Sequence, residues 1–146
     1  MFLVNSLKGL TEKGAIMSKH KTISKKQRLA VYEKCNHRCA YCGCKLDYKD
    51  MQVDHVEPLH RYETAYAIGQ ADFLDEIENL MPSCRQCNFY KSTFSLEDFR
   101  QRLQVSMMNN LRKNFGYKLA LKYGLLEEKM KPIRFYFEEM RGDNND

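Results

Sequence analysis

Apolar residues at helical spacing first appear after Ser24. Ser24 is a favourable N-cap residue, and Leu29 and Tyr32 fall three residues apart, on one face of the segment that follows. This pattern predicts a helix over residues 25–34. Residues 1–19 show no apolar periodicity and contain two glycines, so we expect this segment to be poorly ordered.

The pattern then changes to short runs that favour strands. Residues 45–46 and 51–56 predict two antiparallel strands joined by turn residues at 47–50. The second strand carries Asp54 and His55 next to each other. Because adjacent side chains point to opposite faces of a regular strand, these two can serve one site only if the strand ends or bends there.

The second half of the chain is predicted to be mainly helical. Pro82 is expected to end the connection that precedes a helix starting near Arg85. The remaining predicted elements are an acidic helix at 71–77, a helix at 96–113 opened by a capping box at Ser95–Asp98, a helix at 117–123, a strand at 133–137 and a frayed tail at 141–146. We therefore expect three segments: the poorly ordered residues 1–19, a central domain at 20–104, and a helical extension at 105–146 that ends in a short strand and a tail.

Composition narrows the class of protein. A hydrophobic content of 43% and a charged content of 29% are ordinary for a soluble globular protein. The chain has no apolar run near the roughly 18 residues needed to span a bilayer, and no export signal was recognised. We therefore expect no membrane partner and a cytoplasmic location, where thiols stay reduced and cysteines favour metal binding over disulfides.

The charges are unevenly distributed along the chain. Residues 1–50 carry eleven Lys and Arg against four Asp and Glu, a balance of +7. Residues 51–100 carry four against nine, a balance of −5, and residues 101–146 carry nine against six, a balance of +3. Basic segments on both sides of an acidic centre suit a protein that binds a polyanion and holds a divalent cation in its middle. An ordinary solvated surface would give the same pattern.

Six cysteines provide the strongest local signal. Four of them form two Cys-x-x-Cys pairs, Cys39/Cys42 and Cys84/Cys87. Four thiolates can close a tetrahedral structural zinc site, although the gap of 41 residues between the pairs exceeds the usual ribbon spacing. The other two, Cys35 and Cys44, are expected to be small buried residues beside the zinc.

The motifs between Cys39 and Lys91 occur in a specific order. They read C-x-x-C, D-H, N-L-x-P and C-x-x-C-N-x-x-K. This order resembles the HNH endonuclease family over about residues 28–104, and is similar to the small HNH proteins encoded by phages and prophages. The resemblance implies an α+β fold: a small ββα-metal core (a His-Me finger) stapled by the four-cysteine zinc, with an N-terminal helix and C-terminal helices around it.

The resemblance also implies roles for residues inside the cysteine frame. Asp54 and Asn88 match the ligands of a catalytic divalent ion, and their carboxylate and amide oxygens suit Mg²⁺, with Mn²⁺ or Ni²⁺ as alternatives. His55 matches the general base, Asn79 a residue that braces its loop, and Lys91 a basic position that could neutralise phosphate charge in the transition state. Taken alone, an Asp-His pair is common, and Asn88 would also suit a helix cap.

The predicted function is hydrolysis of DNA phosphodiester bonds by a metal-dependent HNH endonuclease, encoded by a bacterial host or a phage, with one divalent metal and a histidine base. One alternative is a zinc-stapled DNA-binding module without catalysis. Another is a phage packaging accessory protein, whose partners would be packaging proteins. The sequence departs from the fullest family pattern at Asn88, where many members have a histidine, and in an acidic insertion that replaces a Gly-Gly pair.

Overall fold

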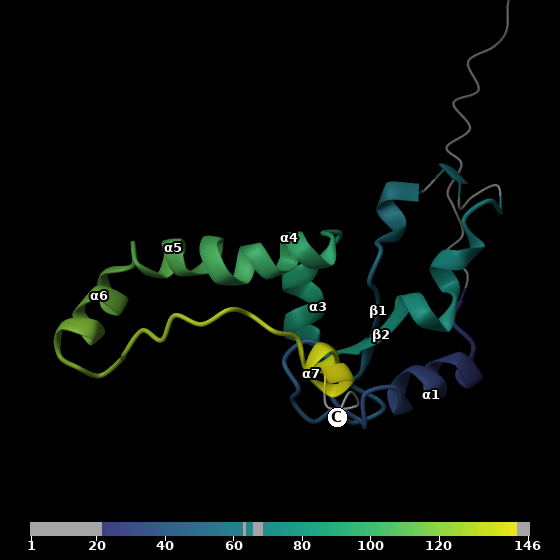
Figure 1. Cartoon of the computed structure of the whole chain (residues 1–146), viewed down its shortest axis with the longest axis horizontal. Coiled ribbons are helices and arrows are strands. Elements are labelled where there is room, and N and C mark those ends of the chain that lie inside the picture. Colours follow the sequence, from purple (N-terminus) through teal and green to yellow (C-terminus); the bar gives the residue numbers. More distant parts are fainter. Residues whose placement is uncertain (1–21, 63, 66–68, 143–146) are drawn as a thin grey trace, which may run out of the picture.

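The computed structural model describes residues 22–62, 64–65 and 69–142 (Figure 1). The segment 1–19, predicted to be poorly ordered, lies outside the described residues, as does most of the predicted tail. The first described helix, α1, spans Lys25–Glu33. Ser24 and Gln27 cap it reciprocally, since each side chain bonds the backbone N–H of the other. The helix predicted at 25–34 is confirmed.

A two-stranded antiparallel sheet lies at the centre of the molecule. Strand β1, Gln52–His55, pairs with β2, Leu80–Ser83, so that Asp54 stands opposite Met81. The predicted pairing of 51–56 with residues 45–46 is wrong, because Lys45 forms only an isolated bridge with Arg38. The observed partner is β2, in which Leu80 pairs with His55, 25 residues earlier in the chain. Because the two strands are not joined by a short turn, the sequence contains no turn motif that would indicate their pairing.

The sequence Leu80-Met-Pro-Ser83 did not suggest a strand because it contains a proline. Pro82 was expected to end the chain segment before the next helix, but it lies inside β2 opposite Val53, with all four residues of the strand buried. A proline is tolerated on an edge strand because only its N–H is missing. Its carbonyl still accepts a hydrogen bond from the Ala40 backbone N–H at 2.8 Å, which joins β2 to the first cysteine pair.

Helix α3, Arg85–Lys91, follows β2 directly. Cys84 is its N-cap residue, and the Cys84 sulfur accepts a hydrogen bond from the Cys87 backbone N–H at 3.4 Å. Two strands and this helix give the ββα order, and the α+β class predicted from the sequence is confirmed. The helix expected near Arg85 is present as predicted.

Two predicted elements are wrong, one between β1 and β2 and one near the end of the chain. The acidic helix expected at 71–77 is instead two short 3-10 turns, η2 at Asp72–Asp75 and η3 at Ile77–Asn79. The strand expected at 133–137 is an irregular segment that leads into helix α7, Tyr136–Gly142. Its alternating pattern has another cause: Phe135 and Phe137 are both buried, and the backbone N–H of Phe137 bonds the Ala40 carbonyl.

A helical arm extends away from the core. The predicted helix at 96–113 is observed as α4, Leu96–Gln101, a π-helical segment, Arg102–Met107, and α5, Met108–Leu111. After α6, Phe115–Lys122, the chain runs back along the arm and places α7 beside the sheet (Figure 1). No helix in the described part of the chain is both long and apolar enough to cross a membrane.

An aromatic cluster joins the arm to the first cysteine pair. The rings of Phe99 and Phe135 stack with centroids 5.3 Å apart, and Tyr41 packs edge-on against both. Such pairs contribute roughly 0.5–1.5 kcal/mol each beyond the burial of their area. Tyr41 is therefore fixed from the α4 side and from the C-terminal side at once, which orients its hydroxyl for the site described next.

Candidate active site and metal centre

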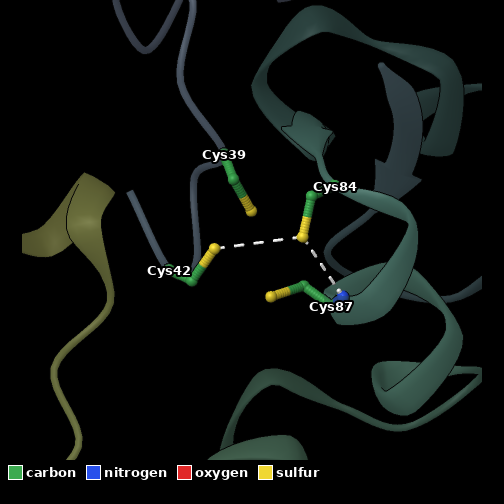
Figure 2. Close-up of side chains that lie close together, drawn as sticks. All are labelled: Cys39, Cys42, Cys84 and Cys87. Carbon is green, nitrogen blue, oxygen red and sulfur yellow. Dashed lines mark hydrogen bonds between the residues drawn. The ribbon is translucent and has the colours of Figure 1, made fainter. Parts of the chain in front are cut away.

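The four paired cysteines converge on one point (Figure 2). Their sulfur atoms all lie within 4.8 Å of one another, and those of Cys42 and Cys84 are 3.9 Å apart. Zn–S bonds of about 2.3 Å in a regular tetrahedron place sulfurs about 3.8 Å apart. The number, type and spacing of the ligand atoms therefore fit a structural zinc ion.

The first pair is presented by a tight turn after α1. The Gly43 backbone N–H bonds the Cys39 carbonyl at 2.9 Å, and Gly43 has a φ of +74°. A Cβ at Gly43 would approach the ring of Tyr136 to 3.1 Å, so both the backbone angle and the packing require glycine. Among the sulfurs, hydrogen bonding from Cys87 lowers the pKa of Cys39, because a thiolate accepts that bond.

The two remaining cysteines differ in their surroundings. Cys35 is 2% exposed and belongs to the hydrophobic core, as predicted. Cys44 is exposed, so the prediction that it is buried is wrong. Its carbonyl accepts a hydrogen bond from the Cys39 backbone N–H at 2.9 Å, so Cys44 contributes to the turn through its backbone.

Asp54 lies at the buried side of β1 and meets two donors. Its Oδ2 accepts a hydrogen bond from the Tyr41 hydroxyl, and the ammonium of Lys91 lies 3.0 Å from the same oxygen. Burial raises the pKa of Asp54, and the Lys91 charge and the Tyr41 hydroxyl act in the opposite direction. Because both contacts use Oδ2, Oδ1 is the oxygen that could serve a cation.

Lys91 is completely buried. Besides its ion pair with Asp54, its ammonium donates to the His55 carbonyl at 2.8 Å. One side chain of α3 thus fixes both the carboxylate and the backbone of the adjacent histidine in β1. The family resemblance suggested that Lys91 could neutralise substrate phosphate. In the structure its ammonium lies inside the protein, against Asp54.

His55 makes a contact that the sequence analysis missed. Its Nε2 lies 3.1 Å from Oδ1 of Asp75 in η2, and both side chains are 17% exposed. A carboxylate in this position fixes the orientation of the imidazole. Asp75 falls within the acidic helix predicted at 71–77, and its spacing from His55 gives no signal of the contact.

Asn79 bridges the loop that follows β1. Its side chain accepts the Glu57 backbone N–H at 2.8 Å and donates to the carbonyls of Glu57 and Leu74 at 3.1 and 2.9 Å. The Asn79 carbonyl also accepts the backbone N–H of Val56. These four bonds hold the segment just after His55 against η2, where Asp75 lies.

Asp54, His55 and Asn88 line one cleft of about 350 Å³, together with His60 and Thr93 among others. Neighbouring side chains diverge in a regular strand, but Asp54 and His55 lie where the strand ends. His55 is the last residue of β1, and the chain turns away directly after it. The structure therefore brings together the two expected metal ligands and the expected base, with Asn79 and Lys91 behind them.

Comparison with known proteins indicates which family this segment resembles. The family model described as HNH endonuclease matches residues 39–94, the part of the chain that contains both cysteine pairs and the cleft. This segment is therefore similar to HNH endonuclease domains. Septu protein PtuB of Bacillus thuringiensis is 37% identical over 68 residues, which cover 45% of this chain and 23% of that protein. The match thus spans under a quarter of the relative's length. No solved structure matched significantly.

Replacing Lys91 by methionine is expected to lower the free energy of unfolding by about 3–5 kcal/mol, because the substitution leaves the Asp54 carboxylate buried without its ion pair. Chemical denaturation in zinc-containing buffer measures this loss. The matched control is Lys113→Met at an exposed position of the arm, which should change stability by no more than about 0.5 kcal/mol. Equal stability of the two variants would show that the ion pair does not support the fold.

Proposed function

We propose that this protein is a metal-dependent endonuclease that hydrolyses DNA phosphodiester bonds with one divalent cation. The observation that carries the proposal is the meeting of Asp54, His55 and Asn88 at one cleft, within a segment that matches the HNH endonuclease model. The match of residues 39–94 to the HNH endonuclease model supports a nuclease activity. The assignment of roles to individual residues is our inference from the contacts around the cleft.

Asp54 Oδ1 and the Asn88 side-chain oxygen are the atoms we assign to the cation. One carboxylate and one amide oxygen suit Mg²⁺, Mn²⁺ or Ni²⁺, ions that keep several water ligands. When bound, such an ion acts as a Lewis acid on the phosphate and stabilises the departing oxygen. The contacts of Tyr41 and Lys91 with Oδ2 hold the Asp54 carboxylate in one orientation, so that its other oxygen faces the cleft.

His55 is the proposed general base. It takes a proton from the attacking water at the ring nitrogen opposite Nε2, while Nε2 stays against Asp75. The Asp75 carboxylate favours the imidazolium that forms, as the aspartate of a catalytic triad does for its histidine. Asn79 supports this step indirectly by bridging the loop after His55 to η2, which keeps imidazole and carboxylate in register.

For Lys91 we propose a positioning role instead of direct contact with the phosphate. Its ammonium is fully buried and already engaged by Asp54 and by the His55 carbonyl. In this position it fixes the metal ligand and the base relative to each other. The four cysteines would hold a zinc ion with no ligand position left for water, so that the ion would fasten the turn of Cys39 and Cys42 to the β2–α3 junction.

A cleavage assay tests the proposal. We expect the purified protein to cut supercoiled plasmid or single-stranded DNA with Mg²⁺, Mn²⁺ or Ni²⁺, and a chelator to stop the reaction until excess metal is added. Asn88→Ala should raise the metal concentration needed for half-maximal rate, because it removes one of two protein ligands. Asn109→Ala, at an exposed position of α5, is the matched control and should behave as the unmodified protein.

Absence of cleavage with all three metals would contradict the endonuclease proposal. Binding of DNA without cleavage, unchanged by Asn88→Ala, would instead favour a zinc-stapled DNA-binding module.

A further inference from the structure

A second cavity adjoins the catalytic cleft. It has a volume of about 540 Å³ and shares His60 and Thr93 with the cleft, so the two hollows meet along one wall. The other residues that matter here are Arg61, Phe94, Asp98 and Arg102. None of them was assigned a role by the HNH motifs, and Phe94 is the last residue of the family match.

Arg102 is held rigidly at this cavity. Its guanidinium carbon lies 4.2 Å from the centre of the Phe94 ring and 4.9 Å from that of Tyr90. A guanidinium placed over two aromatic rings is fixed in orientation without neutralising its charge. Arg102 forms no ion pair with any carboxylate among the described residues, and its Nε is buried without a hydrogen-bond partner there.

The backbone around Arg102 and the shared wall is irregular. Arg102 opens the π-helical segment Arg102–Met107, and π-helical turns inside α-helices occur frequently at functional sites. Ser92, which lines the cleft beside Thr93, has a φ of +51° although it is not glycine. Strain at such residues tends to concentrate at binding sites, because only a functional geometry retains it.

The remaining charges of the cavity also favour an anion. Arg61 is 48% exposed and reaches Glu57 at 3.6 Å and Asp98 at 3.4 Å, distances that indicate weak surface pairs. Asp98 is itself engaged, because its carboxylate accepts the Ser95 hydroxyl at 2.6 Å. Two arginines and one carboxylate, that of Asp98, therefore line the cavity, with Glu57 pairing Arg61 from outside it, and a phosphate that enters could replace Asp98 as the partner of Arg61.

We propose that this cavity is a phosphate-binding subsite for the substrate strand. In it Arg102, assisted by Arg61, binds a phosphate of the nucleic acid that neighbours the linkage held in the Asp54–His55 cleft. Guanidinium groups bind phosphate through paired charge-assisted hydrogen bonds, and Arg102 has unused donors for this purpose. The proposal rests on the nuclease function and adds that the substrate is a polynucleotide with a phosphate next to the one that is cut.

The experiment measures binding of a fluorescent single-stranded oligonucleotide at several salt concentrations. The protein is the His55→Ala variant, which is used so that the DNA stays intact. Adding Arg102→Met should raise Kd about tenfold and lower the slope of log Kd against log salt by about 0.7, the value for one lost phosphate contact. Arg112→Met, which removes an exposed arginine paired with Glu128 on the arm, is the matched control and should leave the slope unchanged.

Two further variants distinguish the loss of a phosphate contact from a loss of folding. Arg102→Lys keeps the charge but not the fork of donors, so it should retain the salt slope and bind more weakly. Arg61→Met, whose side chain makes only exposed contacts, should lower the slope without a change in melting temperature. If Arg102→Met and Arg61→Met both keep the parent slope and Kd, the subsite does not exist.

The two proposals fail separately. Cleavage by the unmodified protein, combined with a salt slope that does not depend on Arg102, would overturn the subsite and leave the nuclease function intact. A slope that depends on Arg102 in a protein that cuts no DNA would support the phosphate subsite and contradict the nuclease function.

Discussion

Replacing His55 by alanine is expected to lower kcat for DNA cleavage by about 10²–10⁴-fold, the range by which a positioned general base accelerates proton transfer. The zinc content and the melting temperature should remain unchanged. The His55 side chain is only partly buried, and its backbone carbonyl, which Lys91 uses, is still present in alanine.

Three measurements are needed: the single-turnover cleavage rate, the metal content and a thermal melt. Asp75→Asn should retain part of the activity, because it keeps a polar partner for the imidazole but removes the charge that stabilises its protonated form. His37→Asn is the matched control. His37 precedes Cys39 at a φ of +58°, which asparagine tolerates, and it contacts Glu33; neither residue lines the cleft. Cleavage by His55→Ala at the unmodified rate would contradict its role as the base.

The sequence predicted the parts of this site that depend on motif order. The two cysteine pairs, and the presence of Asp54, His55 and Asn88 at one place, follow from residues whose types and spacings have a chemical meaning. The α1 and α3 helices were also predicted, because N-capping and apolar spacing are local signals. What the sequence could not supply were contacts that join distant segments without a motif.

Tyr41 and Asp75 make such contacts between distant segments. Tyr41 stands between two cysteines and resembles an ordinary aromatic residue, yet its hydroxyl donates to Asp54 in β1. Asp75 lies in a run of acidic residues that alone suggests a solvated surface, yet it contacts His55. In both cases the contact depends on the pairing of β1 with β2, which the sequence analysis assigned to residues 45–46 instead.

These contacts also connect the four-cysteine cluster with the Asp54–His55 cleft. Tyr41 belongs to the turn that presents Cys39 and Cys42, and through Asp54 it reaches Lys91 at the end of α3, the helix that Cys84 begins. The cysteine turns and strand β1 are therefore linked through Tyr41, Asp54 and Lys91. A loss of zinc should disturb the cleft as well as the fold, because the Tyr41 turn would no longer be fastened to α3.

Replacing Cys84 by serine is expected to abolish zinc binding and to unfold the protein. Zinc binding contributes about 10–16 kcal/mol to the folding of small zinc domains, which is comparable to the 5–15 kcal/mol that separates most folded proteins from their unfolded state. Serine is a favourable N-cap residue, so α3 keeps its cap and the effect is confined to the lost thiolate.

Metal analysis and a thermal melt, each with Cys44→Ser as the matched control, measure this effect. Cys44 is exposed and stands outside the group of four converging sulfurs, so the control should keep one zinc per chain and the unmodified melting temperature. Removing zinc from the unmodified protein with a strong thiol-competing chelator should reproduce the unfolding of Cys84→Ser, and adding zinc should reverse it. A Cys84→Ser protein that keeps its zinc and melts at the unmodified temperature would show that the four sulfurs do not hold this fold together. An ion that fastens the Cys39–Cys42 turn to α3 cannot lose one of its four ligands without a loss of stability.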